Sequence, residues 1–216
     1  MRKFAIILAL GAFSSAAWGQ AGELWVSGGG SLFQNSGLGT DLAFSNSSND
    51  IKLDDGWRIS FRFNFNVGDH YGAEVGYAYN HTDLNFNPAA AAAIGVGTST
   101  TTVGSPTSSA SLGMHMHQGT FDGVYYPFTT DKAKVRPFLV GGVQFDNFVP
   151  PGGQSYNGST KFGLNFGGGV KVHVKGMWAV RLDAREYFTG KPSFGFANNS
   201  GLLWQTEVSA GVGIGF

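Results

Sequence analysis

The segment Trp57–Val67, WRISFRFNFNV, alternates between apolar and polar residues over eleven positions without a break. Its apolar face carries Trp57, Ile59, Phe61, Phe63, Phe65 and Val67, and its polar face carries Arg58, Ser60, Arg62, Asn64 and Asn66. A period of two indicates a β-strand. Soluble strands usually have about five or six residues, whereas a tilted strand needs roughly 9–11 to cross a bilayer. The pattern is therefore typical of a transmembrane strand with lipid on one face and a polar lumen on the other.

Seven further segments are predicted as strands from the same period. Four of them alternate clearly: Ala73–Asn80, Phe162–Val174, Trp178–Tyr187 and Leu202–Phe216. Three more leave their facing open: Glu23–Phe33, Ser111–Phe128 and Val135–Phe148. With Trp57–Val67 the chain has eight predicted strands, and an even number would place both chain ends on one side of the membrane.

The segment Ser111–Phe128 changes phase along its length. Met114 and Met116 share one parity, whereas Phe121 and Tyr125 share the other. A β-bulge near Gln118-Gly119 would reconcile the two halves. Otherwise His115 and His117 point outward near the membrane interface, and the sequence leaves both alternatives open.

The connections alternate in length. The long ones cover roughly residues 34–55, 85–110, 149–160 and 188–200, and the short ones cover 68–71, 127–134 and 175–177. Long loops at one end and short turns at the other predict an all-β, eight-stranded antiparallel up-and-down transmembrane β-barrel. The longest connection, Asn87–Ala110, contains the alanine run 89–93. Five residues are too few to form a helix alone, so a mobile extracellular loop is expected there.

The N-terminus has the pattern of a secretory signal peptide. Arg2 and Lys3 precede the apolar run Phe4–Phe13, and small residues follow it. We expect residues 1–19 to be the cleaved signal and residues 20–216 to be the barrel domain, with cleavage after Gly19 or, alternatively, after Ala17. The chain has no cysteine, so neither a lipid anchor nor a disulfide is expected.

Composition excludes several classes of protein. No apolar run reaches the roughly 18 residues of a transmembrane helix. Charged residues make up 13% of the chain, about half the roughly 25% of soluble domains. Lys and Arg together number 14, as do Asp and Glu, so no basic excess indicates a nucleic-acid partner.

Three segments carry a resemblance to a known family: VSAGVGIGF at residues 208–216, KVRPFLVGG at 134–142 and KFGLNFGGGVKV at 161–172. Together with the signal peptide they resemble the small bacterial outer-membrane β-barrels, the OmpA/OmpX-like eight-stranded family of the porin-like superfamily. The resemblance implies an integral protein of the Gram-negative outer membrane, in contact with its lipid and with both termini in the periplasm. It also implies that the barrel-assembly machinery reads the terminal strand, through Val212, Ile214 and Phe216. It carries over no ligand, so the extracellular partner stays unknown.

Charged residues on the polar faces are predicted to form a network inside the barrel. They are Arg58, Arg62, Glu74, Lys171, Arg181, Asp183, Arg185 and Glu207. An eight-stranded barrel is just wide enough for side chains to fill it, and isolated charges there would be costly. We therefore expect each acid to pair with a base on an adjacent strand and to close the lumen, rather than to line a selective channel or to act in catalysis.

No catalytic, cofactor-binding or metal-binding residue is predicted. The five histidines are His70, His81, His115, His117 and His173, and none has a serine two positions later, as a lipid A deacylase would. The expected function is a structural or surface-interaction role, with extracellular loops carrying any binding. The alternative is a narrow pore or an OmpW-like transporter of small or hydrophobic solutes. A lipocalin-like secreted barrel would need apolar residues inside, whereas Arg58 and Arg62 oppose the aromatic face.

Overall fold

The computed structural model describes residues 21–42, 45–93, 109–128, 134–152 and 156–216. The predicted signal peptide, residues 1–19, lies outside the described residues. Within them, no helix is long and apolar enough to cross a membrane.

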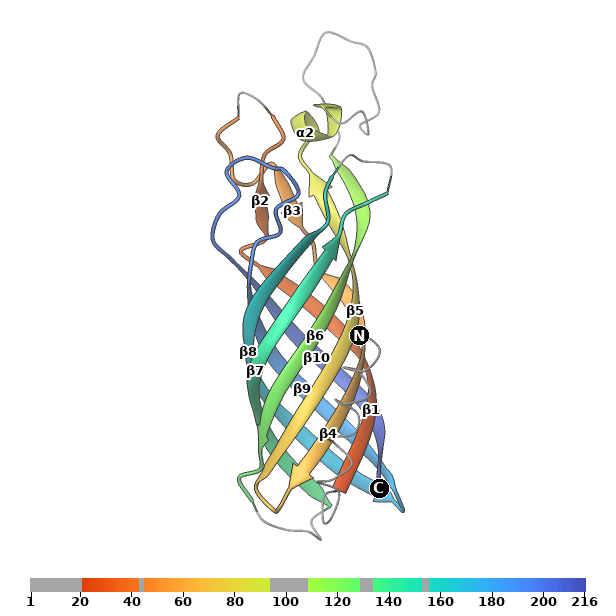
Figure 1. The fold of residues 1–216 in the computed structure, drawn as a ribbon. Coiled ribbons are helices and arrows are strands. Elements are labelled where there is room, and N and C mark those ends of the chain that lie inside the picture. The colour runs from red at the N-terminus through yellow and green to blue at the C-terminus, as the bar shows by residue number, and fades with distance from the viewer. Residues whose placement is uncertain (1–20, 43–44, 94–108, 129–133, 153–155) are drawn as a thin grey trace, which may run out of the picture.

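Eight long antiparallel strands form a closed barrel (Figure 1). They are β1 (Ala21–Gln34), β4 (Gly56–Val67), β5 (Tyr71–Phe86), β6 (Ala110–Tyr125), β7 (Val135–Val149), β8 (Ser159–Lys175), β9 (Trp178–Gly190) and β10 (Leu202–Gly215). Each strand pairs with the next one along the chain, and β1 pairs with β10 to close the wall. Beyond β10, the backbones of Phe216 and Gly22 exchange two hydrogen bonds of 2.8 Å. The predicted eight-stranded barrel is confirmed.

Alternation places apolar side chains on the outer wall and leaves the lumen mainly to polar ones. On β4, Phe61 is half exposed, whereas Arg58 and Arg62 are buried. Every strand is long enough to cross a bilayer with the usual tilt of a barrel, and closure pairs the backbone groups of strands that would otherwise form edges.

The two ends of the barrel differ, as Figure 1 shows. At one end, which we call the turn end, tight turns join β4 to β5 and β8 to β9. Gly68 and Gly176 lie in these turns with φ angles of 63° and 62°, a region that side chains other than glycine rarely adopt. At the other end, which we call the loop end, the connections are long and contain β2 (Gly37–Gly39), β3 (Ile51–Leu53) and α2 (Pro88–Ala93).

On each of the three strands whose facing the sequence left undecided, inward and outward residues alternate without a break. On β6 the pairing with β5 and with β7 runs through Gln118 and Gly119 without a register shift, so no bulge forms there. Met114 and Met116 are therefore buried inside, and His115 and His117 point outward. On β1 and β7 the inward residues include Trp25 and Phe138, both buried.

The expectation of an irregular loop over the whole of Asn87–Ala110 is wrong at its start, where α2 forms. Asn87 caps the helix, since its Oδ1 accepts a hydrogen bond of 2.8 Å from the backbone N–H of Ala90. Ala90 and Ala91 are fully buried against the barrel's loop end. Capping and tertiary packing, which a length argument for an isolated helix leaves out, stabilise this short helix.

Candidate functional site

The middle of the lumen holds a charged cluster centred on Glu74, which projects inward from β5. Its carboxylate lies 2.5 Å from Nη1 of Arg181 and 2.6 Å from Nη2 of Arg185, both on β9 across the lumen. Arg62 of β4 approaches it to 3.6 Å. All four side chains are buried, so the acid is surrounded by three guanidinium groups in a region of low dielectric, where such attraction is strong.

Two further acids balance the same arginines. Asp183 lies 2.7 Å from Nε of Arg181 and 3.1 Å from Nη2 of Arg185. Glu207 lies 2.6 Å from Nη2 of Arg62 and 3.2 Å from Nη1 of Arg58. Seven of the eight sequence-predicted residues therefore meet in one cluster. Most of the pairs run across the lumen: Glu207 of β10 pairs with β4, two strands away, rather than with the expected arginines of β9.

Lys171, the eighth predicted residue, lies opposite Arg181 on the neighbouring strand but pairs with an acid outside this cluster. Its Nζ forms an ion pair with Glu23 of β1 and donates a hydrogen bond of 2.7 Å to the Tyr126 hydroxyl. Glu23 also accepts a hydrogen bond of 2.9 Å from Nε1 of Trp25. Sequence reasoning missed Glu23 because the facing of β1 was open.

The charged cluster has two partners on β6 that the sequence did not identify. Asp122 lies 3.0 Å from Nη1 of Arg185, and Gln118 accepts a hydrogen bond of 2.9 Å from Nη2 of Arg58. Both share the inward parity of Met114 and Met116, so the signal existed but required the phase of β6 to be known.

A polar layer adjoins the cluster on its loop-end side. Ser31 donates a hydrogen bond of 2.7 Å to Oδ1 of Asn80, and Nε2 of Gln205 donates one of 2.9 Å to the Ser31 hydroxyl. Nε2 of Gln118 donates in turn to Gln205, at 3.2 Å. Side chains from β1, β5, β6 and β10 thus meet across the lumen, where they fill it.

The loop end of the lumen is apolar. A cluster of buried side chains occupies it, which we call the apolar cap: Phe33, Leu38, Ile51, Leu53, Leu84, Phe86, Ala90, Ala91, Met114, Met116, Phe148, Phe194, Phe196 and Leu203. Strand residues on inward positions and loop residues both contribute. The inward parity of Leu84, Met114 and Leu203 was the available signal, whereas the loop members alternate only over short stretches such as Ile51–Leu53.

The histidines form no metal site. Across the described ranges, no group of three or more His, Cys, Asp or Glu side chains could hold a metal ion. His115 and His117 lie on the outer wall, where their Nδ1 atoms contact the hydroxyls of Tyr79 and Tyr77 at 2.6 and 2.7 Å.

The predicted assembly-signal residues lie at the turn end: Val212 and Ile214 on β10, and Phe216 directly after it. The side chains of Phe216 and Val212 are well exposed on the outer wall, and Ile214 is partly exposed between them.

A closed antiparallel barrel with an apolar outer wall and a mainly polar interior is the architecture of outer-membrane β-barrel proteins. The family described as "Outer membrane protein beta-barrel domain" matches residues 5–216, and the chain belongs to this family. No curated protein sequence matches the chain.

Solved structures of outer-membrane proteins share the fold. The outer membrane protein OprG from Pseudomonas aeruginosa aligns with a TM-score of 0.58 at 15% identity, over 91% of this chain and 97% of OprG. Neisserial surface protein A (NspA) aligns with a TM-score of 0.53 at 16% identity, over 92% of this chain and 98% of NspA. At these identities the likeness concerns the fold alone.

Proposed function

We propose that this protein is a closed outer-membrane barrel with a structural or surface-interaction role, in which the loop end carries any binding and no reaction is catalysed. The observation that supports it is the filled lumen. The charged cluster, the polar layer and the apolar cap follow one another along the axis, and the largest side chains among them are fully buried. A barrel of eight strands has little room beyond such side chains.

Planar-bilayer recording of the purified protein tests this proposal. We expect no steady single-channel conductance from the wild type, because paired charges and packed apolar side chains exclude a continuous water column. Glu74→Ala should increase conductance, since it leaves Arg181 and Arg185 without their shortest ion pairs. Steady, ion-selective currents from the wild type would contradict a closed barrel.

A second function is favoured by the apolar cap. An apolar loop end of the lumen would accept a hydrophobic solute if the loops that pack on it moved, as an OmpW-like transporter would require. Uptake of a fluorescent hydrophobic solute into vesicles that contain the barrel would support this alternative. Uptake equal to that of empty vesicles would remove it.

We propose further that the loop end faces the outside of the cell and that both termini are periplasmic. The absence of cysteine from the chain makes single-cysteine labelling direct. Ser48→Cys places a thiol on an exposed loop-end residue, and Asp69→Cys places one on an exposed turn-end residue. On intact cells a bulky, impermeant maleimide should label only Ser48→Cys, and the reverse result would invert the orientation.

The proposed partner during insertion is the barrel-assembly machinery, which would read Val212, Ile214 and Phe216. Phe216→Ala removes the exposed ring but keeps the backbone hydrogen bonds to Gly22. We expect less folded protein in the outer membrane, measured by fractionation and heat-modifiable gel mobility, and near-normal levels for the aromatic control Phe216→Tyr. Equal levels in all three proteins would argue against this signal.

A further inference from the structure

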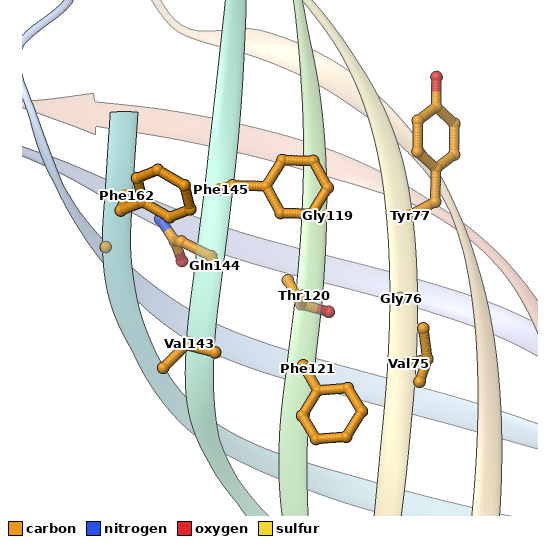
Figure 2. Close-up of a pocket in the computed structure, with 11 residues that line it drawn as sticks. Val75, Gly76, Tyr77, Gly119, Thr120, Phe121, Val143, Gln144, Phe145 and Phe162 are labelled. Carbon is orange, nitrogen blue, oxygen red and sulfur yellow. The ribbon is translucent and has the colours of Figure 1, made fainter. Parts of the chain in front are cut away.

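Among the described residues, one buried acid of the lumen is paired with no base. Asp146 of β7 is fully buried, and none of the ion pairs of this part of the chain includes it. Its Oδ2 accepts a hydrogen bond of 2.9 Å from Nε2 of Gln144, whereas its Oδ1 has no hydrogen-bond partner there. Gln144 lies between Val143 and Phe145, which are exposed on the outer wall beside a groove (Figure 2). Alternation therefore turns Gln144 and Asp146 into the lumen.

The surroundings of Asp146 offer no unpaired base. Besides Gln144, the side chains that act on it most strongly are Gln118 of β6, Thr189 of β9 and Arg58 of β4. Of these only Arg58 is charged, and its Nη1 is held 3.2 Å from Glu207. Ionising a carboxyl group that is buried without a paired base is costly, so such a group becomes neutral instead. In this arrangement of the lumen, Asp146 therefore carries a proton.

A lysine lies opposite this acid but is bonded elsewhere. Lys161 of β8 is the cross-strand partner of Asp146, and both occupy inward positions. Directly opposed residues on antiparallel strands have Cβ atoms about 4.5–5.5 Å apart, so side-chain rotation alone can bring the ammonium group to the carboxyl group. In the structure, Nζ of Lys161 instead donates a hydrogen bond of 3.3 Å to the hydroxyl of Ser193. Lys161 thus has two alternative partners.

Ser193 belongs to the long loop between β9 and β10, residues 191–201. Its backbone N–H donates a hydrogen bond of 3.0 Å to the hydroxyl of Ser159 on β8, and the two hydroxyl oxygens lie 3.4 Å apart. Together with the lysine contact, these bonds fasten the loop to β8, and we call them the Ser193 latch. The backbone of the same loop also bonds to the first long loop, where Thr40 and Ala197 exchange two hydrogen bonds of 2.9 Å.

The Ser193 latch lies next to aromatic side chains that close the lumen. Phe194 follows Ser193 directly, Phe196 comes two positions later, and both are buried in the apolar cap. Phe148 of β7, also in the cap, is the cross-strand partner of Ser159. Release of Ser193 would therefore free the segment that carries Phe194 and Phe196, and the loop end of the lumen would open.

We propose that Asp146 and Lys161 form a proton-controlled switch for the Ser193 latch. When Asp146 is protonated, Lys161 holds Ser193 and the loop closes the lumen. When the carboxyl group loses its proton to water, the ammonium group turns inward, forms a buried ion pair with the carboxylate and releases Ser193. The apolar cap then becomes accessible, while the charged cluster still blocks the lumen. The inference goes beyond the surface role proposed above and does not depend on conduction.

Thiol labelling of the apolar cap tests the switch. Leu203→Cys places the only cysteine of the chain at a fully buried cap position, and a small methanethiosulfonate reagent measures access to it in folded protein in detergent. Between about pH 5.5 and pH 8, we expect the rate to rise about tenfold more than in an Asp146→Asn background, which supplies the thiol's own pH dependence. Tenfold is the scale of one hydrogen bond to a charged group. Equal pH dependence in both backgrounds would overturn the proposal.

Two lysine variants separate the switch from a general loosening of the loops. Lys161→Met removes the ammonium group that changes partners, so the additional pH dependence should disappear. Lys191→Met removes a lysine of the same loop that donates a hydrogen bond of 2.6 Å to the carbonyl oxygen of Gly37, and it should keep the additional pH dependence. Persistence in Lys161→Met, or loss in Lys191→Met, in protein whose gel mobility shows it folded, would overturn the assignment of Lys161.

A second measurement needs no buried cysteine. Phe196→Trp places an indole in the apolar cap, and its emission should shift to the red as the pH rises and water reaches it. In the same protein, Ser159→Cys/Ser193→Cys replaces the two hydroxyls that lie 3.4 Å apart, and oxidation to a disulfide locks the loop to β8. We expect the locked protein to show no red shift. A red shift that survives the disulfide would overturn the proposal.

Discussion

The charged cluster and the apolar cap fill the same lumen by opposite means. In the cluster, Glu74 and Glu207 are held by arginines from strands across the barrel, and attraction in a buried site offsets the cost of removing the charges from water. In the cap, Leu84 and Met114 are held by burial alone. The first region depends on every partner being present, whereas the second tolerates rearrangement as long as volume is kept.

Removal of Glu74 is the strongest test of this difference between the charged cluster and the apolar cap. Glu74→Ala should lower the free energy of unfolding by roughly 3–5 kcal/mol, because it leaves buried arginines uncompensated. Urea titration of the barrel refolded in lipid measures it. The double variant Glu74→Leu/Arg181→Met removes charge of both signs and should lose less than the two single variants together. A loss below about 1 kcal/mol for Glu74→Ala would be the value of an exposed pair and would mean that water enters the cluster.

The cap should respond to lost volume instead. Leu84 is fully buried there, and Leu84→Ala should cost about 2–4 kcal/mol through the cavity it leaves. Leu164→Ala, on the exposed wall, is the matched control and should cost less. Leu84 and Glu74 lie ten positions apart on β5, so their effects should add within about 0.5 kcal/mol. Strong coupling would show that the cap and the cluster interact, through direct contact or a shared network.

The difference between the two regions also explains what the sequence could predict. Alternation predicts the barrel and seven members of the charged cluster. An arginine such as Arg62, on the strand face opposite the aromatic side chains, must point into the lumen. Asp122 was missed because the sequence did not decide which residues of β6 face inward. Glu23 was missed for the same reason on β1.

The cap was missed for a different physical reason. Its loop members, such as Leu38 and Phe194, lie in segments too short or too irregular to predict as strands. Tertiary contacts decide which of them fold back onto the lumen. The same holds for α2, whose burial and cap outweigh its short length. The prediction of partners on adjacent strands was wrong for Glu207, because long arginine side chains reach across a narrow barrel.

A smaller loss of stability is expected at Asn87, where the apolar cap meets solvent. Its Oδ1 caps α2 and its Nδ2 donates a hydrogen bond of 2.8 Å to Asp50. Asn87→Ala should destabilise this corner by about 1 kcal/mol, the usual cost of losing a helix cap. Amide exchange at Ala90 and Ala91 should then accelerate about fivefold, while Asn87→Ser, which keeps an uncharged N-cap acceptor beside Asp50, should change it less. Unchanged exchange in Asn87→Ala would mean that packing alone holds the helix.

The smallest expected effect is a pH dependence at Asp50, which joins the first long loop to Asn87. Burial raises the pKa of this carboxyl, but hydrogen bonds from Ser45, Thr40, Ser47 and Asn87 outweigh it and hold the pKa below its usual value. The unfolded carboxyl has a pKa of about 3.9. A depressed pKa in the folded state means that this stabilisation is complete above about pH 4 and is lost as the pH falls below it.

Pepsin is active in that pH range. If protonation of Asp50 loosens the first long loop, pepsin should cleave within residues 34–55 faster at pH 2 than at pH 4. Asp50→Asn does not titrate, so its cleavage rate supplies the baseline for the enzyme's own pH profile. The barrel wall should stay resistant to pepsin over the same pH range. A wild-type rate that follows the Asp50→Asn rate throughout would mean that the acid contributes nothing to the loop. A simultaneous loss of the barrel would mean that loop end and cluster are not separate regions at all.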